Sequence, residues 1–425
     1  MKKAFISLII CTLICITSCR SNTNAWIRIN QLGYRINDIK VAVFISKKNL
    51  TLQSFKVIEV NSGEVVMTFK NVVKTESLEP FISCYRLPFS DLKKSGVYRI
   101  VAGNIVSPDF RIADDIYNTT ADFLLNYMRQ QRCGFNPYVK DSCHTQDGYE
   151  IYGKSGDSAH IDVTGGWHDA ADYLQYVATS ANAAYQMLFA YSENPASFGD
   201  KYMANGLPGA DGIPDVLNES KWGLDWLIKM NPEPGVMFNQ IADDRDHIGF
   251  RSPNNDSADY GKGHERPVYY CTGKPQGLFK YKNRTTGIAS TAGKFASAFA
   301  KGSRVYKPLK PEFSKLLGNK AIAAFSYGLK NPGVCQTAPG TAPYFYEEDN
   351  WTDDMELAAI ELFNLTGDSK YFDYAVEYGR KELVTPWIGS DTSRQYQWYH
   401  FVNMGHPGIA PQQKTRKEHW FASHR

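Results

Sequence analysis

The stretch that decides the fold is residues 165–173, which read Gly-Gly-Trp-His-Asp-Ala-Ala-Asp-Tyr. Two carboxylates, Asp169 and Asp172, stand three positions apart where a helical pattern begins. On a helix, positions i and i+3 share a face, about 5–6 Å apart, and the positive helix end lowers the cost of ionising both. Carboxylates held in this way can accept hydrogen bonds from one water molecule and take a proton from it. A helix cap is the alternative role of the pair.

The helical pattern that begins here continues through the rest of the chain. A stripe of apolar residues predicts a helix over residues 169–191. The stripe consists of Tyr173, Val177, Ala181, Ala184 and Leu188. Further helices are predicted over residues 115–131, 214–231, 287–306, 311–328, 351–366, 368–384 and 394–404. Since no strand is evident, we expect residues 114–425 to form an all-α domain. Its long irregular stretches, 132–168 and 232–286, are typical of functional loops.

A metal site is the second chemical feature of this region. Two thiols and two imidazoles are a sufficient tetrahedral set for zinc. They are Cys133, Cys143, His144 and His168. If His168 is a ligand, it fixes the backbone directly before Asp169, and the ion is structural because all four positions are filled. A disulfide between Cys133 and Cys143 is the alternative.

The region before residue 114 has a different period. Short runs rich in β-branched and aromatic residues recur with turns between them. They lie at residues 26–30, 40–45, 55–60, 64–69, 84–87 and 97–102. Several runs alternate between apolar and polar residues, so one face of each should be buried. We therefore expect an immunoglobulin-like β-sandwich over residues 25–113.

The N-terminus has the layout of a lipoprotein signal peptide over residues 1–18. A basic start precedes a short apolar run that ends Ile-Thr-Ser-Cys at Cys19, and such a run is too short to span a membrane. We expect cleavage before Cys19, lipidation of that residue and a location in the bacterial cell envelope. A plain secretory signal is the alternative. The cysteines that remain are odd in number, which argues against a complete disulfide framework. They are Cys84, Cys133, Cys143, Cys271 and Cys335.

The charge composition excludes one class of partner. The chain has 47 Lys and Arg against 44 Asp and Glu, a net charge of +3. So small a balance gives no electrostatic footprint for nucleic acid. Aromatic residues make up 13% of the 425 residues, which is consistent with stacking on sugar rings and with an aromatic-rich core.

Taken together, these motifs resemble glycoside hydrolase family 9, the cellulase family, in the subgroup with an N-terminal immunoglobulin-like domain. Residues 165–173 are similar to the family's aspartate motif, and the cysteine and histidine set matches the subgroup's zinc ligands in order. Similar blocks occur at 30–34 (Asn-Gln-Leu-Gly-Tyr), 211–219 (Asp-Gly-Ile-Pro-Asp-Val-Leu-Asn-Glu), 350–354 (Asn-Trp-Thr-Asp-Asp) and 366–368 (Thr-Gly-Asp). The resemblance covers residues 25 to about 410.

The resemblance implies both a fold and an activity. The fold is an (α/α)6 barrel with an open cleft, which follows the β-sandwich in the sequence. The activity is inverting hydrolysis of β-1,4-glucans such as cellulose, by a chain that we expect to be a monomer. Asp172 matches the general base, and Asp169 matches the partner that positions the attacking water. Asp211 and Asp215 lie where some relatives bind calcium, with a helix cap as the alternative.

The C-terminal part departs from the family pattern. An inverting enzyme holds its general acid about 6.5–9.5 Å from the base, and in this family the acid is a glutamate in a late Asn-Glu motif. No such motif is found, since Glu418 lies in a different context. The predicted helices also use up residues 114–425 before twelve are reached. We therefore expect an incomplete barrel, C-terminally truncated, and a crippled activity. A non-catalytic, glycan-binding surface lipoprotein is the alternative.

Overall fold

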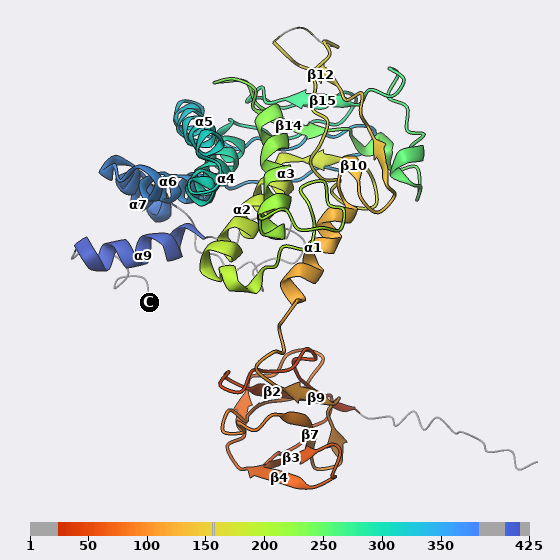
Figure 1. Ribbon diagram of the computed structural model, residues 1–425, viewed down its shortest axis with the longest axis vertical. Helices are drawn as coiled ribbons and strands as arrows, with labels where there is room; N and C mark the ends of the chain where they lie inside the picture. Colours follow the sequence, from red (N-terminus) through yellow and green to blue (C-terminus); the bar gives the residue numbers. More distant parts are fainter. Residues whose placement is uncertain (1–23, 155, 157, 382–403, 417–425) are drawn as a thin grey trace, which may run out of the picture. The chain divides into compact units, whose positions relative to one another are not determined.

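The computed structural model describes residues 24–154, 156, 158–381 and 404–416 in two units, Met1–Asn118 and Thr119–Arg425. The first unit is a sandwich of two antiparallel sheets (Figure 1). One sheet has the order β1-β2-β6-β5, formed by Ala25–Arg28, Val41–Ser46, Ser83–Pro88 and Val73–Thr75. The other has the order β4-β3-β7-β8, formed by Val65–Phe69, Phe55–Glu59, Gly96–Ala102 and Ile105–Val106, and β9 (Phe110–Ile112) also pairs with β7.

Alternation along the strands builds the core of this sandwich. Phe44 of β2, Val57 of β3 and Ile100 of β7 are all buried, and their strand neighbours are more exposed. The predicted sandwich is confirmed. Strands β5, β8 and β9 were not predicted. They contain 3, 2 and 3 residues, which is too short to show the alternation of apolar and polar residues that marks a strand.

The second unit is mainly helical. Its helices are α1 (Thr120–Gln130), α2 (Val177–Glu193), α3 (Asp215–Met230), α4 (Ala289–Tyr306), α5 (Pro311–Lys330), α6 (Thr352–Thr366), α7 (Ser369–Lys381) and α9 (Gly405–Arg416). Helix α4 packs between α2 and α6, and α3, α5 and α7 pack against this inner row (Figure 1). Within the described part of the chain, no helix is long and apolar enough to cross a membrane.

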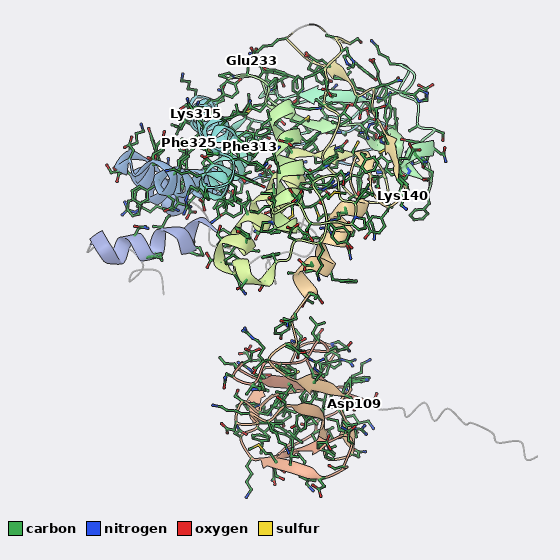
Figure 2. All side chains as sticks on the ribbon, in the orientation of Figure 1. Asp109, Lys140, Glu233, Phe313, Lys315 and Phe325 are labelled. Atoms are coloured by element: carbon green, nitrogen blue, oxygen red, sulfur yellow. The ribbon has the colours of Figure 1, made fainter. Side chains whose placement is uncertain are left out.

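Small residues explain how α4 comes to lie inside this unit. Every residue of α4 except Arg304 and Val305 is buried, and a Cβ at Gly293 would lie 2.7 Å from the backbone of Asp354 in α6. Aromatic side chains hold α5 on its neighbours: Phe325, labelled with Phe313 in Figure 2, meets Tyr371 and Tyr374 of α7 edge-on at 5.7 Å. The predicted helices over 287–306, 311–328 and 351–366 are found with ends within two residues.

The expectation of a second unit without strands is wrong. A sheet of order β12-β15-β14-β13 is formed by Tyr149–Ile151, Pro267–Tyr270, Phe238–Ile241 and Gln175–Tyr176. A smaller ribbon pairs β10 (Gly134–Asn136) with β11 (Asp141–Cys143). The residues of β12, β14, β15 and β13 are all buried. Strands buried on both faces do not alternate, so sequence periodicity gives no signal for them.

The helix expected to begin at Asp169 begins instead at Val177. Residues 169–172 form a bend, closed by a hydrogen bond of 2.8 Å from the Asp169 N–H to the Leu174 carbonyl. Pairing with β14 takes Gln175 and Tyr176, which would have belonged to the second turn of the expected helix. The argument from a shared helix face therefore does not hold for the aspartate pair. The predicted helix over 394–404 lies outside the described residues apart from residue 404, and α9 was not predicted.

A buried charge cluster joins α4 to the start of α6. Lys294 Nζ donates to Glu348 and to Asp354, at 2.5 Å each. Asp353 is 4% exposed, and neither of its carboxylate oxygens accepts a hydrogen bond from the described residues. Burial raises the pKa of Asp353 to about 7, and the positive charge of Lys294 only partly opposes this. The cluster therefore carries more negative than positive groups in a buried place.

Replacing Asp353 with asparagine is expected to stabilise the protein above pH 7. The raised pKa means that the native state holds this proton more tightly than the unfolded state, whose pKa is near 3.8. The free energy of unfolding therefore falls as pH rises from about 4 to about 7 and stays low above that. Asparagine does not ionise, so Asp353→Asn should gain on the order of 2 kcal/mol at pH 8, since one pKa unit corresponds to about 1.4 kcal/mol.

Urea unfolding at pH 5 and at pH 8 measures this difference. The exposed Asp373→Asn, on α7, is the matched control and should be neutral at both values. An Asp353→Asn variant that is less stable than the parent at pH 8 would show that the ionised carboxylate stabilises the cluster.

Candidate active site

The bend that carries the two aspartates is fixed by the residues just before it. Gly166 has a φ of 72°, and a Cβ there would lie 2.6 Å from Trp226, so only glycine fits. Trp167 donates its indole N–H to Glu219 at 2.8 Å. Glu219 is fully buried and also holds both nitrogens of the Arg132 fork, at 3.1 and 2.7 Å. A paired buried carboxylate of this kind anchors the entry to the bend.

Asp169 is held at both carboxylate oxygens. Thr179 donates its hydroxyl to Oδ1 at 2.7 Å, and Tyr346 donates to Oδ2 at 2.6 Å. Burial raises the pKa of Asp169, and these two hydrogen bonds oppose the rise. The side chain is therefore oriented by partners from α2 and from the loop before α6.

Asp172 is held at only one oxygen. Its Oδ2 lies 2.9 Å from Nε2 of His247. Its Oδ1 is buried and accepts no hydrogen bond from the described residues. Burial raises the pKa of Asp172, as do the charges of Asp169 and Asp246, whereas His247 lowers it. Asp172 therefore presents one free oxygen whose affinity for a proton is higher than that of an exposed aspartate.

The structure brings the four predicted metal ligands together. The donor atoms of Cys133, Cys143, His144 and His168 all lie within 4.8 Å of one another. Pairing of Gly134 with Cys143 brings the two cysteines close, and both have free thiols, so the disulfide alternative is not formed. Burial raises the pKa of Cys133, while a hydrogen bond with Cys133 lowers that of Cys143.

The surroundings of His144 fit the role of a metal ligand. Its Nε2 lies 2.9 Å from Oδ2 of Asp256, while its Nδ1 is buried without a hydrogen-bond partner among the described residues. Histidines that bind metals commonly donate their other ring N–H to a carboxylate in this way. The donor set and this free nitrogen fit an ion bound by two thiolates and two imidazoles.

Asp211 and Asp215 are placed differently. Asp211 accepts from the N–H groups of Ala204 and Ile213 and from the Asn218 amide, at 2.9–3.1 Å. Asp215 accepts from two further backbone N–H groups, and its other oxygen lies 3.4 Å from Arg129. Within the described ranges, these carboxylates are not part of a group of ligand side chains close enough to hold one ion.

Sequence reasoning missed three partners of the aspartate pair and of the cluster: Tyr346, His247 and Asp256. His247 and Asp256 lie in the long irregular stretch 232–286 that was expected to be functional, but nothing local distinguishes them there. Tyr346 lies 177 residues from Asp169. Cys19 and Glu418 lie outside the described residues.

The aspartate pair thus lies in a mainly helical unit that follows a β-sandwich in the sequence. The family model described as glycosyl hydrolase family 9 matches residues 117–412, and that of the cellulase N-terminal ig-like domain matches residues 22–107. The chain belongs to glycosyl hydrolase family 9. The expected fold class, an immunoglobulin-like sandwich followed by a helical domain of the (α/α)6 type, is confirmed. The incompleteness of the barrel stays a prediction.

Several relatives are similar over most of this chain. It is 27% identical over 392 residues to a cellodextrinase of Butyrivibrio fibrisolvens, covering 90% of this chain and 66% of the relative. It is 25% identical over 402 residues to endoglucanase D of Acetivibrio thermocellus, covering 89% and 57%. A crystal structure of a metagenome-derived family 9 endoglucanase aligns with a TM-score of 0.65 at 26% identity, covering 92% and 71%. The chain thus spans about three-fifths to two-thirds of the length of these curated relatives.

Proposed function

We propose that this chain hydrolyses β-1,4-glycosidic bonds in cellulose-like β-glucans by an inverting mechanism. The observation that carries the proposal is the free, buried Oδ1 of Asp172 beside the firmly held Asp169. In this mechanism, Asp172 takes a proton from the attacking water, and Asp169 helps to orient that water. His247 stabilises the carboxylate form of Asp172 through its other oxygen. The family and the named relatives support the choice of β-glucan.

The general acid is not assigned in this chain. The proposal is therefore best tested by comparing substrates whose leaving groups differ in their need for a proton. Natural glucan needs a proton on the departing oxygen, a contribution of about 10²–10⁴-fold. A dinitrophenyl cellobioside releases a stable phenolate without protonation. We expect the chain to hydrolyse this aryl glycoside far better than carboxymethyl-cellulose. Binding of glucan with no release of product from either substrate would contradict the proposed hydrolysis and favour a glycan-binding protein.

We further propose that the cluster of Cys133, Cys143, His144 and His168 binds a structural zinc ion. Four protein donors leave no open position for a substrate, so the ion supplies folding energy and not a reactive water. Its effect on the site is positional, because His168 directly precedes Asp169. Elemental analysis of the purified protein should find about one zinc per chain, and less than half an equivalent would contradict the assignment. The same analysis tests calcium at Asp211 and Asp215.

The hydroxyl of Tyr346 is expected to help to set the pKa of Asp169. The hydrogen bond from Tyr346 lowers that pKa, so Tyr346→Phe should raise it and move the acid limb of the kcat/KM profile to higher pH. We expect about a tenfold loss in kcat/KM near neutral pH with KM little changed, since one such hydrogen bond to a charged group contributes about 1.5–3 kcal/mol. Tyr374→Phe, on α7, is the matched control. Superimposable pH profiles for Tyr346→Phe and the parent would contradict this role.

We propose that Cys19 carries the lipid that anchors a monomer to the bacterial cell envelope. The signal-like residues 1–18 and the cysteine that follows them support this. Mass spectrometry of the membrane fraction should find diacylglycerol on Cys19, and Cys19→Ala should release the protein from that fraction. Light scattering of the chain without its first 19 residues should give the monomer mass. A parent protein found in the soluble fraction would contradict the lipid anchor. The mass of a dimer would contradict the monomer.

A further inference from the structure

A chain of polar contacts leads away from the metal cluster through Asp256. Oδ2 of Asp256 lies 2.9 Å from Nε2 of His144, and its Oδ1 accepts a hydrogen bond from Nε of Arg251. The side chains of His144, Asp256 and Arg251 are 6%, 9% and 11% exposed. Contacts this well shielded from water are only weakly screened by salt. The orientation of His144 is thus tied to that of Arg251.

The other end of Arg251 reaches the residue that holds the catalytic bend. Nη2 of Arg251 donates to Oδ1 of Asp246 at 2.8 Å. The same oxygen accepts the backbone N–H of Tyr173 at 2.8 Å, and Tyr260 donates its hydroxyl to the second oxygen at 2.8 Å. Asp246 is fully buried. Arg251 therefore joins two carboxylates, one on the metal side and one on the side of the bend.

Two residues tied to Asp246, Tyr173 and His247, are also tied to Asp172. Tyr173 directly follows Asp172, and His247 directly follows Asp246 and bonds to Oδ2 of Asp172 at 2.9 Å. A shift of Asp246 would therefore move the backbone after the base and the partner of the base together.

The ring of Tyr173 makes a second connection between the two sites. The Arg251 guanidinium lies over this ring, 4.6 Å from its centre. The imidazoles of His144 and His168 also lie next to this ring, with centres at 5.4 and 4.7 Å. A cation over an aromatic face is attracted by the ring, and more strongly in a place shielded from water. Tyr173 thus contacts both Arg251 and the two histidines of the cluster.

We propose that Arg251 and Asp256 couple occupancy of the Cys/His cluster to the position of Asp172. With Nδ1 of His144 bound to an ion, its Nε2 would carry the proton that Asp256 accepts. This fixes Asp256, and through Arg251 it fixes Asp246, Tyr173 and His247. Arg251 and Asp256 are positioning residues that touch neither the ion nor the substrate. The role of Asp172 in this coupling rests on the proposed function, whereas the effect on the metal does not.

The test uses variants of the full-length zinc-bound protein and follows zinc transfer to a chromophoric chelator in excess. Replacing a residue that orients a metal ligand costs about 10–100-fold in metal affinity. Asp256→Asn should therefore release zinc at least about tenfold faster than the parent. Arg251 is not one of the four ligands, so the expected acceleration of about threefold or more in Arg251→Gln must pass through Asp256 or through the ring of Tyr173. Arg35→Gln, which removes an exposed surface pair, is the control and should release zinc at the parental rate.

The variant Arg251→Lys distinguishes the effect of the positive charge from the effect of joining Asp246 to Asp256. Lysine keeps the positive charge but does not join two carboxylates with one planar fork, so this variant should release zinc like Arg251→Gln. A parental release rate in Arg251→Lys or Arg251→Gln would overturn the bridge. Thermal melting of each zinc-loaded variant, with a transition close to that of the parent, identifies the folded preparations on which rates are compared.

The pH profile for hydrolysis of the aryl cellobioside measures whether the bridge also affects Asp172. In Arg251→Gln, no guanidinium opposes the negative charge of Asp246, and this charge raises the pKa of Asp172. The acid limb of kcat/KM should therefore move to higher pH in this variant. An unchanged limb in a variant that releases zinc quickly would overturn the coupling. If the parent protein hydrolyses no substrate, the proposed function fails, and the zinc-release rates still decide whether the bridge holds the metal site.

Discussion

Asp172→Asn is expected to lower kcat/KM on the aryl cellobioside by about 10²–10⁴-fold, the usual contribution of a general base. Asparagine keeps the size of the side chain and the contact with His247, but its amide does not take a proton from water. KM should change little, because the loss falls on the transition state. The exposed Asp225→Asn, on α3, is the matched control and should keep the parental rate.

The pH dependence gives an independent view of the same residue. Asp172 must be ionised to act as a base, so kcat/KM should fall as pH drops through its pKa, which burial raises above the ordinary value of 3.8. His247 lowers that pKa. His247→Ala should therefore move the acid limb to higher pH and leave the alkaline side in place. A limb that moves to lower pH would contradict the contact between these two side chains.

Loss of one cluster ligand is expected to have the largest effect on stability. Cys133 is fully buried, and Cys133→Ser replaces a thiolate ligand with a poor one. Zinc bound by four protein ligands contributes folding energy, about 10–16 kcal/mol in isolated zinc-finger peptides. This unit has a large core of its own, so we expect a smaller loss, on the order of 3–5 kcal/mol. Chelation of zinc from the parent should give a similar loss.

Calorimetry and elemental analysis together check this expectation. Cys84→Ser is the matched control, because Cys84 is a buried free thiol in the β-sandwich and lies outside the cluster. It should keep its zinc, and the transition of the helical unit should be unchanged. A Cys133→Ser protein that retains one zinc per chain, or one that melts like the parent, would contradict a structural four-ligand site.

Local signals explain which parts of the fold were predictable. Helix α4 follows from a run of residues that are small and apolar at helical spacing, and β2 follows from a short run rich in β-branched and aromatic residues. The sheet around β14 does not, because each of its strands finds its partner far along the chain and is buried on both faces. The same sheet moved the start of α2 from Asp169 to Val177. Local helix propensity was thus overridden by tertiary pairing.

The candidate site shows the same division. The aspartate pair and the Cys/His set were predicted from their residue types and order together with the resemblance to the family, since their spacing alone left a helix cap and a disulfide as alternatives. Their partners were not, because Tyr346 and His247 reach Asp169 and Asp172 across 177 and 75 residues. Nothing in the sequence around Tyr346 differs from that around other tyrosines. Which oxygen of Asp172 stays free is a consequence of these distant contacts alone.

The anomeric form of the first product tests the central claim most directly. If Asp172 activates a water that attacks the anomeric carbon from the face opposite the leaving group, configuration is inverted. Proton NMR recorded during hydrolysis of the β-configured aryl cellobioside should therefore show α-cellobiose first, with the β-anomer appearing only by mutarotation. Initial release of β-cellobiose, or no cellobiose at all, would contradict the assignment of Asp172 as the base of an inverting β-glucan hydrolase.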